Sequence, residues 1–323
     1  MKIANMRRLF IALAASLPLM AAAQDRYPEK LITLVVPFAP GGVADVTART
    51  VAEAMAKTLG KTVIVDNRPS AGSIVATQFV AGAKPDGYTL LLMSNGNAVS
   101  EGLFKKLPYD TVKDLTPVST LGFFDLGVFV SADSRFKSLK DLLSHAKQHP
   151  GELKMGTIAV GSTQHLAAQL FQTQAGIDMI PVPYKGSPAV LLALRGGEVD
   201  VGVEILAPML GQVKSGAVRV LAVTGDRANP ALPSTPTVQQ SGVANYNVSS
   251  WNAIAVPTGT PPAIVQRLHQ AVQQALATPA VRAALEAQGV RVQGSTPAEA
   301  QALVASEIKR WGAVIRAAKI EPQ

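Results

Sequence analysis

Two turns in this sequence combine residue types that favour binding of an anion. The first, Pro40-Gly41-Gly42, follows an apolar segment and precedes an amphipathic segment that begins at Val43. A strand-turn-helix junction directs unpaired backbone N–H groups towards one point, and the helix dipole adds about half a positive charge there. The sequence therefore predicts an anion site that needs no Lys or Arg.

The second turn is Gly161-Ser162-Thr163, and it precedes an amphipathic segment that carries His165 in its first helical turn. Its hydroxyl and N–H groups can hold a carboxylate. Ser162 and His165 also suggest a nucleophile with its base, but that chemistry needs a third, orienting group and the sequence has no G-x-S-x-G elbow. We expect a binding protein with no catalytic residues, and a secreted Ser/His hydrolase is the alternative.

Further candidates for the same site follow other apolar segments. Ala71 and Gly72 lie at a turn-to-helix junction, which an ordinary helix cap at Ser70 would also explain. Ser94 and Asn95 end an apolar segment, where they either bind a polar ligand or form a turn. The remaining candidates are aromatic, glycine or acidic residues next to predicted strand ends: Phe38, Asp45, Tyr184, Gly186 and Glu204.

The two acidic candidates have more than one possible role. Asp45 lies in the first turn of a predicted helix, where the dipole favours a carboxylate with or without a ligand nearby. Glu204 ends a predicted strand. It could receive a ligand amine, orient a water or pair with a neighbouring cation, and the sequence leaves these three roles open.

Cofactor and metal sites are not expected. His145 and His149 are four residues apart on a predicted helix, which is a spacing of metal ligands, but no Cys or nearby acid completes a set in the sequence. We interpret this pair as part of a solvated helix face. The sequence contains neither G-x-G-x-x-G nor a Walker A motif. The formal charge of +8 falls to +5 without Lys2, Arg7 and Arg8, and the remaining Lys and Arg are scattered, so nucleic-acid binding is not expected either.

Alternating strands and helices are expected to position these turns. The pattern predicts strands at 31–36, 62–66, 89–93, 118–121, 126–130, 154–157, 180–183, 199–203 and 219–223. It predicts helices at 43–59, 73–83, 139–148, 163–175, 188–195, 205–214, 263–275 and 297–318. This alternation indicates an α/β protein whose parallel sheets are covered on both faces.

The first 23 residues are predicted to be a secretory signal peptide. Lys2, Arg7 and Arg8 precede an apolar run. A group of small residues that ends with Ala23 follows this run, and we place the cleavage after Ala23. The chain has no Cys, which excludes disulfides and lipid attachment through Cys. The mature protein is expected to be soluble in a bacterial periplasm and monomeric.

The mature chain is long enough for two lobes. We place lobe 1 at 24–124 plus 251–323 and lobe 2 at 125–250, with the chain crossing near 122–127 and near 246–252. Two crossing segments would form a hinge, and a ligand would bind in the central cleft beyond the strand ends.

Several motifs, in order along the mature chain, resemble those of the Bug family, the TctC-like receptors of tripartite tricarboxylate transporters. They are VPFAPGGVAD at 36–45, DNRPSAG at 66–72, PDGYTL at 85–90, YD at 109–110 and YKGS at 184–187. The resemblance implies a type II periplasmic-binding-protein fold, whose two lobes close on a carboxylate. It implies that the clamping loops are 38–45 and 161–165, and that two membrane proteins are the transport partners.

Two positions depart from the pattern of the family. The family often has a longer glycine-rich run at 71–75, and Asp is common where this chain has Glu204. The function implied is periplasmic capture of a dicarboxylate, tricarboxylate, acidic amino acid or aromatic acid for a tripartite tricarboxylate transporter. A receptor that presents its ligand to a membrane sensor kinase is an alternative, because the capture chemistry would be the same.

Overall fold

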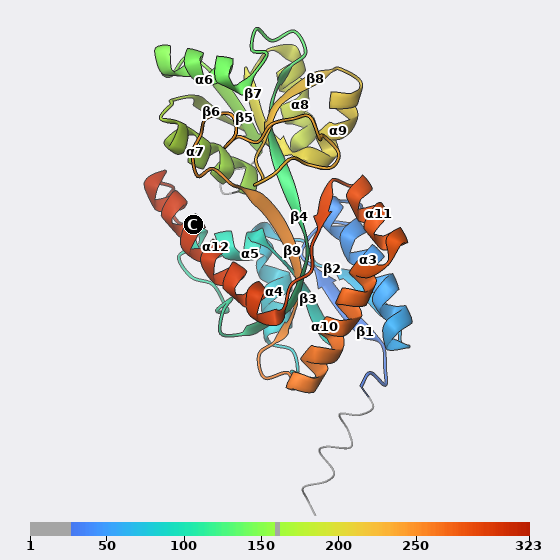
Figure 1. Ribbon diagram of the computed structural model, residues 1–323. Coiled ribbons are helices and arrows are strands. Elements are labelled where there is room, and N and C mark those ends of the chain that lie inside the picture. The colour runs from blue at the N-terminus through green and yellow to red at the C-terminus, as the bar shows by residue number, and fades with distance from the viewer. Residues whose placement is uncertain (1–26, 159–161) are drawn as a thin grey trace, which may run out of the picture.

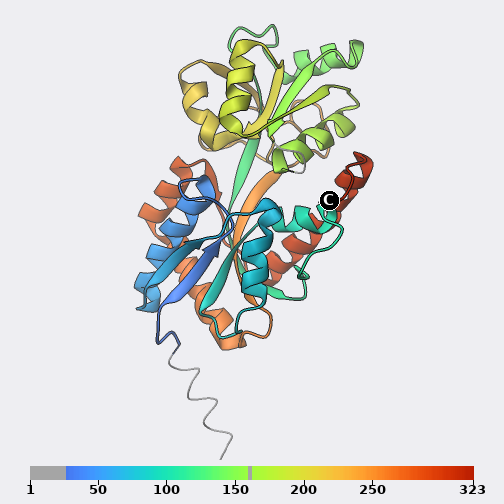
Figure 2. The same ribbon diagram turned by 180° about the vertical axis from the view of Figure 1, so that it is seen from behind.

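The computed structural model describes residues 27–158 and 162–323, and these form two groups of strands and helices. Figure 1 shows a lower group from the beginning and end of the chain and an upper group from its middle, with β4 and β9 running between them. The view from behind shows the same arrangement (Figure 2). The predicted signal peptide and Gly161 lie outside the described residues.

The lower group is built on three parallel strands and two longer antiparallel ones. β1 (Ile32–Val36) lies between β2 (Val63–Asn67) and β3 (Thr89–Ser94), and both pair with it in parallel. β9 (Ser249–Pro257) then pairs antiparallel with β3 on one side and with β4 (Leu115–Ser131) on the other. The short β10 (Val290–Val292) also pairs with β4.

Helices cover both faces of this sheet. They are α3 (Val43–Leu59), α4 (Ile74–Ala81), α5 (Asn95–Leu103), α10 (Pro262–Ala277), α11 (Pro279–Ala287) and α12 (Pro297–Ala317), with a short 3-10 turn at Ala71–Ser73. In α3, Val51, Met55 and Leu59 recur every fourth residue and are buried against the sheet. The helix ends at Gly60, whose φ of 69° is the left-handed conformation that glycine adopts readily.

The upper group repeats the parallel arrangement. β5 (Lys154–Ile158) pairs in parallel with β6 (Ile180–Tyr184) and with β7 (Val201–Ile205). The far half of β4 pairs antiparallel with β7 and with β8 (Val218–Val223). The helices of this group are α6 (Leu139–Gln148), α7 (Thr163–Ala175), α8 (Ser187–Gly196) and α9 (Leu206–Lys214).

The prediction of two separate strands at 118–121 and 126–130 is wrong, because β4 is one strand of 17 residues. The sequence suggests a break at Asp125, since aspartate is depleted in strands. Its carboxylate is instead buried and satisfied by remote residues. It accepts hydrogen bonds from Ser249 Oγ at 2.8 Å and Asn229 Nδ2 at 2.9 Å, and Arg291 Nε lies 3.2 Å away. These partners allow the strand to continue from one group into the other.

Ser94 and Asn95 do not form a plain turn, because a helix, α5, starts at Asn95. The Ser94 side chain accepts a hydrogen bond from the Gly96 N–H at 3.2 Å, and the Ser94 N–H donates to Asn97 Oδ1 at 2.9 Å. This reciprocal pair is a capping box in which Asn takes the place of the usual Glu or Gln.

Along residues 27–158 and 162–323, no helix has the length and hydropathy needed to cross a membrane.

Candidate functional site

The described candidate residues lie at or just after the carboxyl ends of six strands. Those of β1, β2 and β3 share one edge because the three strands are parallel, and those of β5, β6 and β7 do the same in the upper group. The lower set holds Phe38, Pro40, Gly41, Gly42, Asp45, Ala71, Gly72, Ser94 and Asn95. The upper set holds Ser162, Thr163, His165, Tyr184, Gly186 and Glu204.

A hydrogen bond between Asn95 and Thr163 joins these two sets. Asn95 begins α5 directly after β3, and its Nδ2 donates to the Oγ1 of Thr163, the first residue of α7, at 2.9 Å. Asn95 is fully buried, and its Oδ1 accepts a hydrogen bond from Trp311 Nε1 on α12 at 2.7 Å. Both ends of the Asn95 amide are therefore fixed, and the strand ends of the two groups meet here.

Asp45 supports the first turn from within. Its Oδ2 accepts hydrogen bonds from the Gly41 N–H at 2.9 Å and from Arg49 Nε at 3.0 Å. Asn67 Nδ2 donates both to Asp45 Oδ1, at 2.8 Å, and to the Phe38 carbonyl, at 2.9 Å. Burial raises the pKa of Asp45, but these hydrogen bonds outweigh burial and hold the pKa below its usual value. The charged carboxylate therefore fixes the loop.

The turn that Asp45 supports is open to solvent. Pro40, Gly41 and Gly42 are exposed, and Phe38 is 36% exposed. Gly41 has a φ of 86°, which explains the need for glycine at this position. Gly42 precedes α3 with an extended backbone and makes no side-chain cap hydrogen bond to this helix. The first turn of α3 therefore offers backbone groups to a ligand. The geometry suits an external anion.

The Ala71–Gly72 junction is packed against α5 rather than open on all sides. Gly72 has a φ of 61°, and its carbonyl accepts a hydrogen bond from Ser100 Oγ at 2.8 Å. A Cβ at this position would lie 2.5 Å from Ser100 Oγ, so only glycine fits. Ser70 precedes the 3-10 turn but makes no side-chain cap hydrogen bond to it; its Oγ instead accepts from the Val75 N–H of α4 at 3.0 Å, and Ala71 is exposed.

Ser162 caps α7. Its Oγ accepts a hydrogen bond from the backbone N–H of His165 at 3.1 Å and donates to the Ile158 carbonyl at 3.3 Å. Among the described residues both partners of this hydroxyl are thus backbone groups, which is the role of a cap rather than of a nucleophile. His165 is 6% exposed, and burial lowers its pKa, so the neutral imidazole is favoured.

Glu204 is fully buried where three elements of the upper group meet. Its Oε2 accepts hydrogen bonds from Ser187 Oγ at 2.6 Å and Gln164 Nε2 at 3.4 Å, whereas Oε1 has no hydrogen-bond partner among the described residues. Burial raises its pKa, and the two side-chain hydrogen bonds oppose that effect. Among the described residues no Lys or Arg forms an ion pair with Glu204, so pairing with a neighbouring cation, one of the three roles left open, is not observed.

Gln164 and Ser187 donate to the Glu204 carboxylate, and neither was among the predicted candidates. Both lie in the first turn of a helix that directly follows a parallel strand, which is the signal that identified Ser162 and Gly186.

Tyr184 ends β6 and is half-buried. Burial raises the pKa of Tyr184, and the nearby carboxylate of Glu198 adds to the effect.

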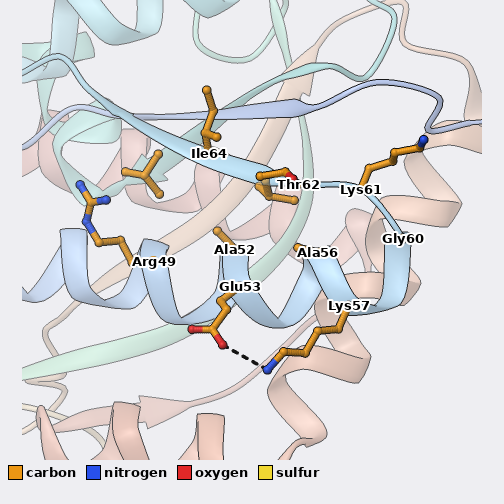
Figure 3. A pocket seen from close by; sticks show the side chains of 11 residues that line it. Arg49, Ala52, Glu53, Ala56, Lys57, Gly60, Lys61, Thr62 and Ile64 are labelled. Carbon is orange, nitrogen blue, oxygen red and sulfur yellow. Dashed lines mark hydrogen bonds and ion pairs between the residues drawn. The ribbon is translucent and has the colours of Figure 1, made fainter.

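A separate groove of about 820 Å³ lies between α3 and the edge strand β2 (Figure 3). Its lining includes the exposed ion pair of Glu53 and Lys57, at 3.1 Å, and Ile64 of β2. It extends towards the amino end of β2, away from the strand ends that carry the candidates, and only Arg49 connects it to the Asp45 network. We therefore do not assign the ligand to this groove.

The expectation that no nearby acid completes a set of metal ligands with His145 and His149 is wrong. Glu152 Oε1 is 3.1 Å from His145 Nε2, and Glu152 Oε2 is 3.3 Å from His149 Nδ1. Helical spacing alone does not predict this contact, because Glu152 lies in the turn after α6 and that turn brings it back to the two rings.

Comparisons with known proteins agree with this architecture. Residues 47–320 match the model of the tripartite tricarboxylate transporter family receptor, TctC. Protein BugT of Bordetella pertussis is 36% identical over 97% of this chain and 98% of its own. Among solved structures, R. palustris Rpa4515 with adipate is 34% identical, with a TM-score of 0.79 over 92% of this chain and 100% of that chain. MatC from Rhodopseudomonas palustris with bound malate is 32% identical, with a TM-score of 0.74 over 90% of this chain and 100% of that chain.

These similarities confirm the resemblance to the Bug family and the expected periplasmic-binding-protein fold. Family and fold are those of solute-binding proteins. The chain belongs to the TctC family of tripartite tricarboxylate transporter receptors.

Proposed function

We propose that this receptor binds a small carboxylate between the two sets of strand ends and delivers it to the membrane components of a tripartite tricarboxylate transporter. The Asn95–Thr163 hydrogen bond is the observation that carries the proposal, because it brings the helix starts of both groups to one place. Rpa4515 and MatC, whose structures hold adipate and malate, support a dicarboxylate.

Backbone groups do most of the binding in this proposal. The first turn of α3 and the first turn of α7 each offer N–H groups that have no partner inside their helix. A carboxylate placed against them receives charge-assisted hydrogen bonds and the favourable end of two helix dipoles. A ligand that leaves these N–H groups unpaired is rejected, which is the source of selectivity.

Closure of two lobes completes the proposal. Lobe 1 comprises 24–124 plus 251–323, lobe 2 comprises 125–250, and β4 and β9 are the connections that bend. A ligand drives closure only if it binds the closed arrangement more tightly than the open one. We place the receptor in the periplasm after removal of residues 1–23.

Thermal unfolding in the presence of carboxylates tests the proposal. The panel contains malate, adipate, citrate, glutamate and benzoate, and the control is succinamide, which has no charge. At a concentration of about 100 times Kd, a true ligand adds roughly 2.7 kcal/mol to the free energy of unfolding and raises Tm. If no carboxylate at saturating concentration shifts Tm, the proposal is wrong.

Val43→Pro tests the role of the backbone. Val43 is the first residue of α3, a position that accepts Pro, and Gly42 before it already has the extended backbone that Pro requires (φ −78°, ψ 167°). The substitution deletes one N–H of the proposed cradle. We expect carboxylate affinity to fall at least tenfold (about 1.4 kcal/mol) while the unliganded Tm is kept. The control, Val43→Ala, keeps both the N–H and the affinity.

A further inference from the structure

Three potential metal ligands meet on the upper group, away from the proposed carboxylate site. His145 and His149 lie one helical turn apart at the end of α6, and Glu152 lies in the turn that leads to β5. One nitrogen of each ring and one carboxylate oxygen all lie within 4.8 Å of one another. We call these three residues the His145–His149–Glu152 cluster.

The surrounding structure holds the cluster in place. The two imidazole rings stack with centroids 4.4 Å apart, and the Phe136 ring packs against His145 at 5.5 Å. The His149 N–H donates to the His145 carbonyl at 2.9 Å, and the Glu152 N–H donates to the His149 carbonyl at 3.3 Å. The rings and the turn are therefore largely ordered before any ion binds, which lowers the entropic cost of binding.

A cation already lies against the cluster. Arg135 Nη2 is 2.8 Å from His145 Nε2 and 3.3 Å from Glu152 Oε1, so the guanidinium lies between an imidazole nitrogen and a carboxylate oxygen. The carbonyl end of α6 adds negative potential at the same place. The Arg135 side chain is 59% exposed, so it can move into solvent when another cation takes its place.

We propose that the His145–His149–Glu152 cluster binds a divalent transition-metal ion of the zinc type, in competition with Arg135. Two imidazoles and one carboxylate form a ligand set that suits Zn²⁺ and neighbouring ions, with water completing the coordination. Mg²⁺ and Ca²⁺ prefer oxygen ligands only and are excluded as occupants. The bound ion would link the end of α6 to the turn before β5.

Titration calorimetry of the full mature chain with Zn²⁺ tests the site. We expect one ion per chain, and no heat of binding with Mg²⁺ at the same concentration. His149→Gln and Glu152→Gln each remove one ligand from a half-exposed position and should weaken Zn²⁺ binding at least tenfold. His269→Gln is the matched control, because His269 lies on α10 outside the cluster, and it should leave the affinity unchanged.

Arg135→Gln gives the opposite result if the competition is real. Removal of the guanidinium frees His145 Nε2 and also takes a positive charge away from the site. The affinity for Zn²⁺ should therefore rise severalfold. Co²⁺ adds a second measurement, since a tetrahedral site containing imidazole gives visible absorption bands that the His149→Gln variant should lose. Zn²⁺ binding that persists in both His149→Gln and Glu152→Gln, or no Zn²⁺ binding at all, would overturn the proposal.

Discussion

The Asp45 carboxylate holds the shape of the loop at the proposed ligand site. Its hydrogen bonds reach Gly41, Arg49 and Asn67, and one Asn67 contact extends to the Phe38 carbonyl. The sequence placed Asp45 at the site but could not show this role. Asn67 and Arg49 approach from a neighbouring strand and from the next helical turn, and neither belonged to the predicted set.

Asp45→Asn is expected to lower the free energy of unfolding at pH 7 by about 2 kcal/mol, because hydrogen bonds to a buried charged group are lost. The folded-state pKa of Asp45 lies below its unfolded value. Its contribution is therefore full above the unfolded pKa of about 3.9 and disappears as the pH falls through the lower folded pKa. Urea unfolding from pH 7 down to pH 2 should show the difference between wild type and variant shrinking below pH 4.

The control for this measurement is Asp66→Asn. Asp66 forms an ion pair with Arg68 at 2.8 Å in which both side chains are about one-third exposed, so its loss should cost much less than that of Asp45. Equal losses for the two variants would contradict the role given to Asp45.

The contribution of Glu204 to the free energy of unfolding has the opposite pH dependence to that of Asp45. Its folded-state pKa is raised by burial, so the folded protein binds a proton at Glu204 more readily than the unfolded chain does. Stability therefore falls as the pH rises from the ordinary Glu value of about 4.3 through the raised folded pKa. The stability difference between Glu204→Gln and wild type should shift in favour of the variant between pH 4 and pH 7, measured by urea unfolding. Glu53→Gln, at an exposed position, should show no such shift.

Side-chain caps stabilise the starts of several helices, and α12 is one of them. A capping box begins this helix: Thr296 Oγ1 accepts from the Glu299 N–H at 3.2 Å, and Glu299 Oε2 accepts from the Thr296 N–H at 2.8 Å. Thr296→Ala should lower the free energy of unfolding by about 1 kcal/mol, seen as a lower urea midpoint. Ser306→Ala, which removes an exposed hydroxyl further along the same helix, should have little effect.

The elements that the sequence missed depend on contacts between distant residues. Parallel strands with helices between them follow from local patterns, and their predicted ends agree with the structure to within about two residues. The continuity of β4 through Asp125 depends on Arg291 and Ser249, more than 100 residues away, so no local pattern could show it. The start of α5 was missed because Asn97 completes its capping box, a residue type that also indicates turns.

At the scale of the whole molecule, the Asn95–Thr163 hydrogen bond couples the two groups. A neutral hydrogen bond contributes about 1 kcal/mol, a factor of about five in an equilibrium between two arrangements. We expect Asn95→Ala and Thr163→Val to be non-additive in urea unfolding, with a coupling energy of at least 0.5 kcal/mol. Additive effects would show that the two side chains do not meet in solution.

The position of β9 between β3 and β4 has a consequence for the order in which the protein can fold. An emerging chain that has reached residue 248 already contains β5, β6, β7 and β8, so the upper group has all of its strands. The lower sheet still lacks its central member, and apolar residues such as Leu92 would line an unpaired edge. In a chain truncated at residue 248, which keeps the buried Tyr246 and Val248, the upper group should therefore resist proteolysis while the lower group stays sensitive. A chaperone that binds the newly made protein must therefore protect β1, β2 and β3 of the lower group until β9, in the last quarter of the chain, has been synthesised.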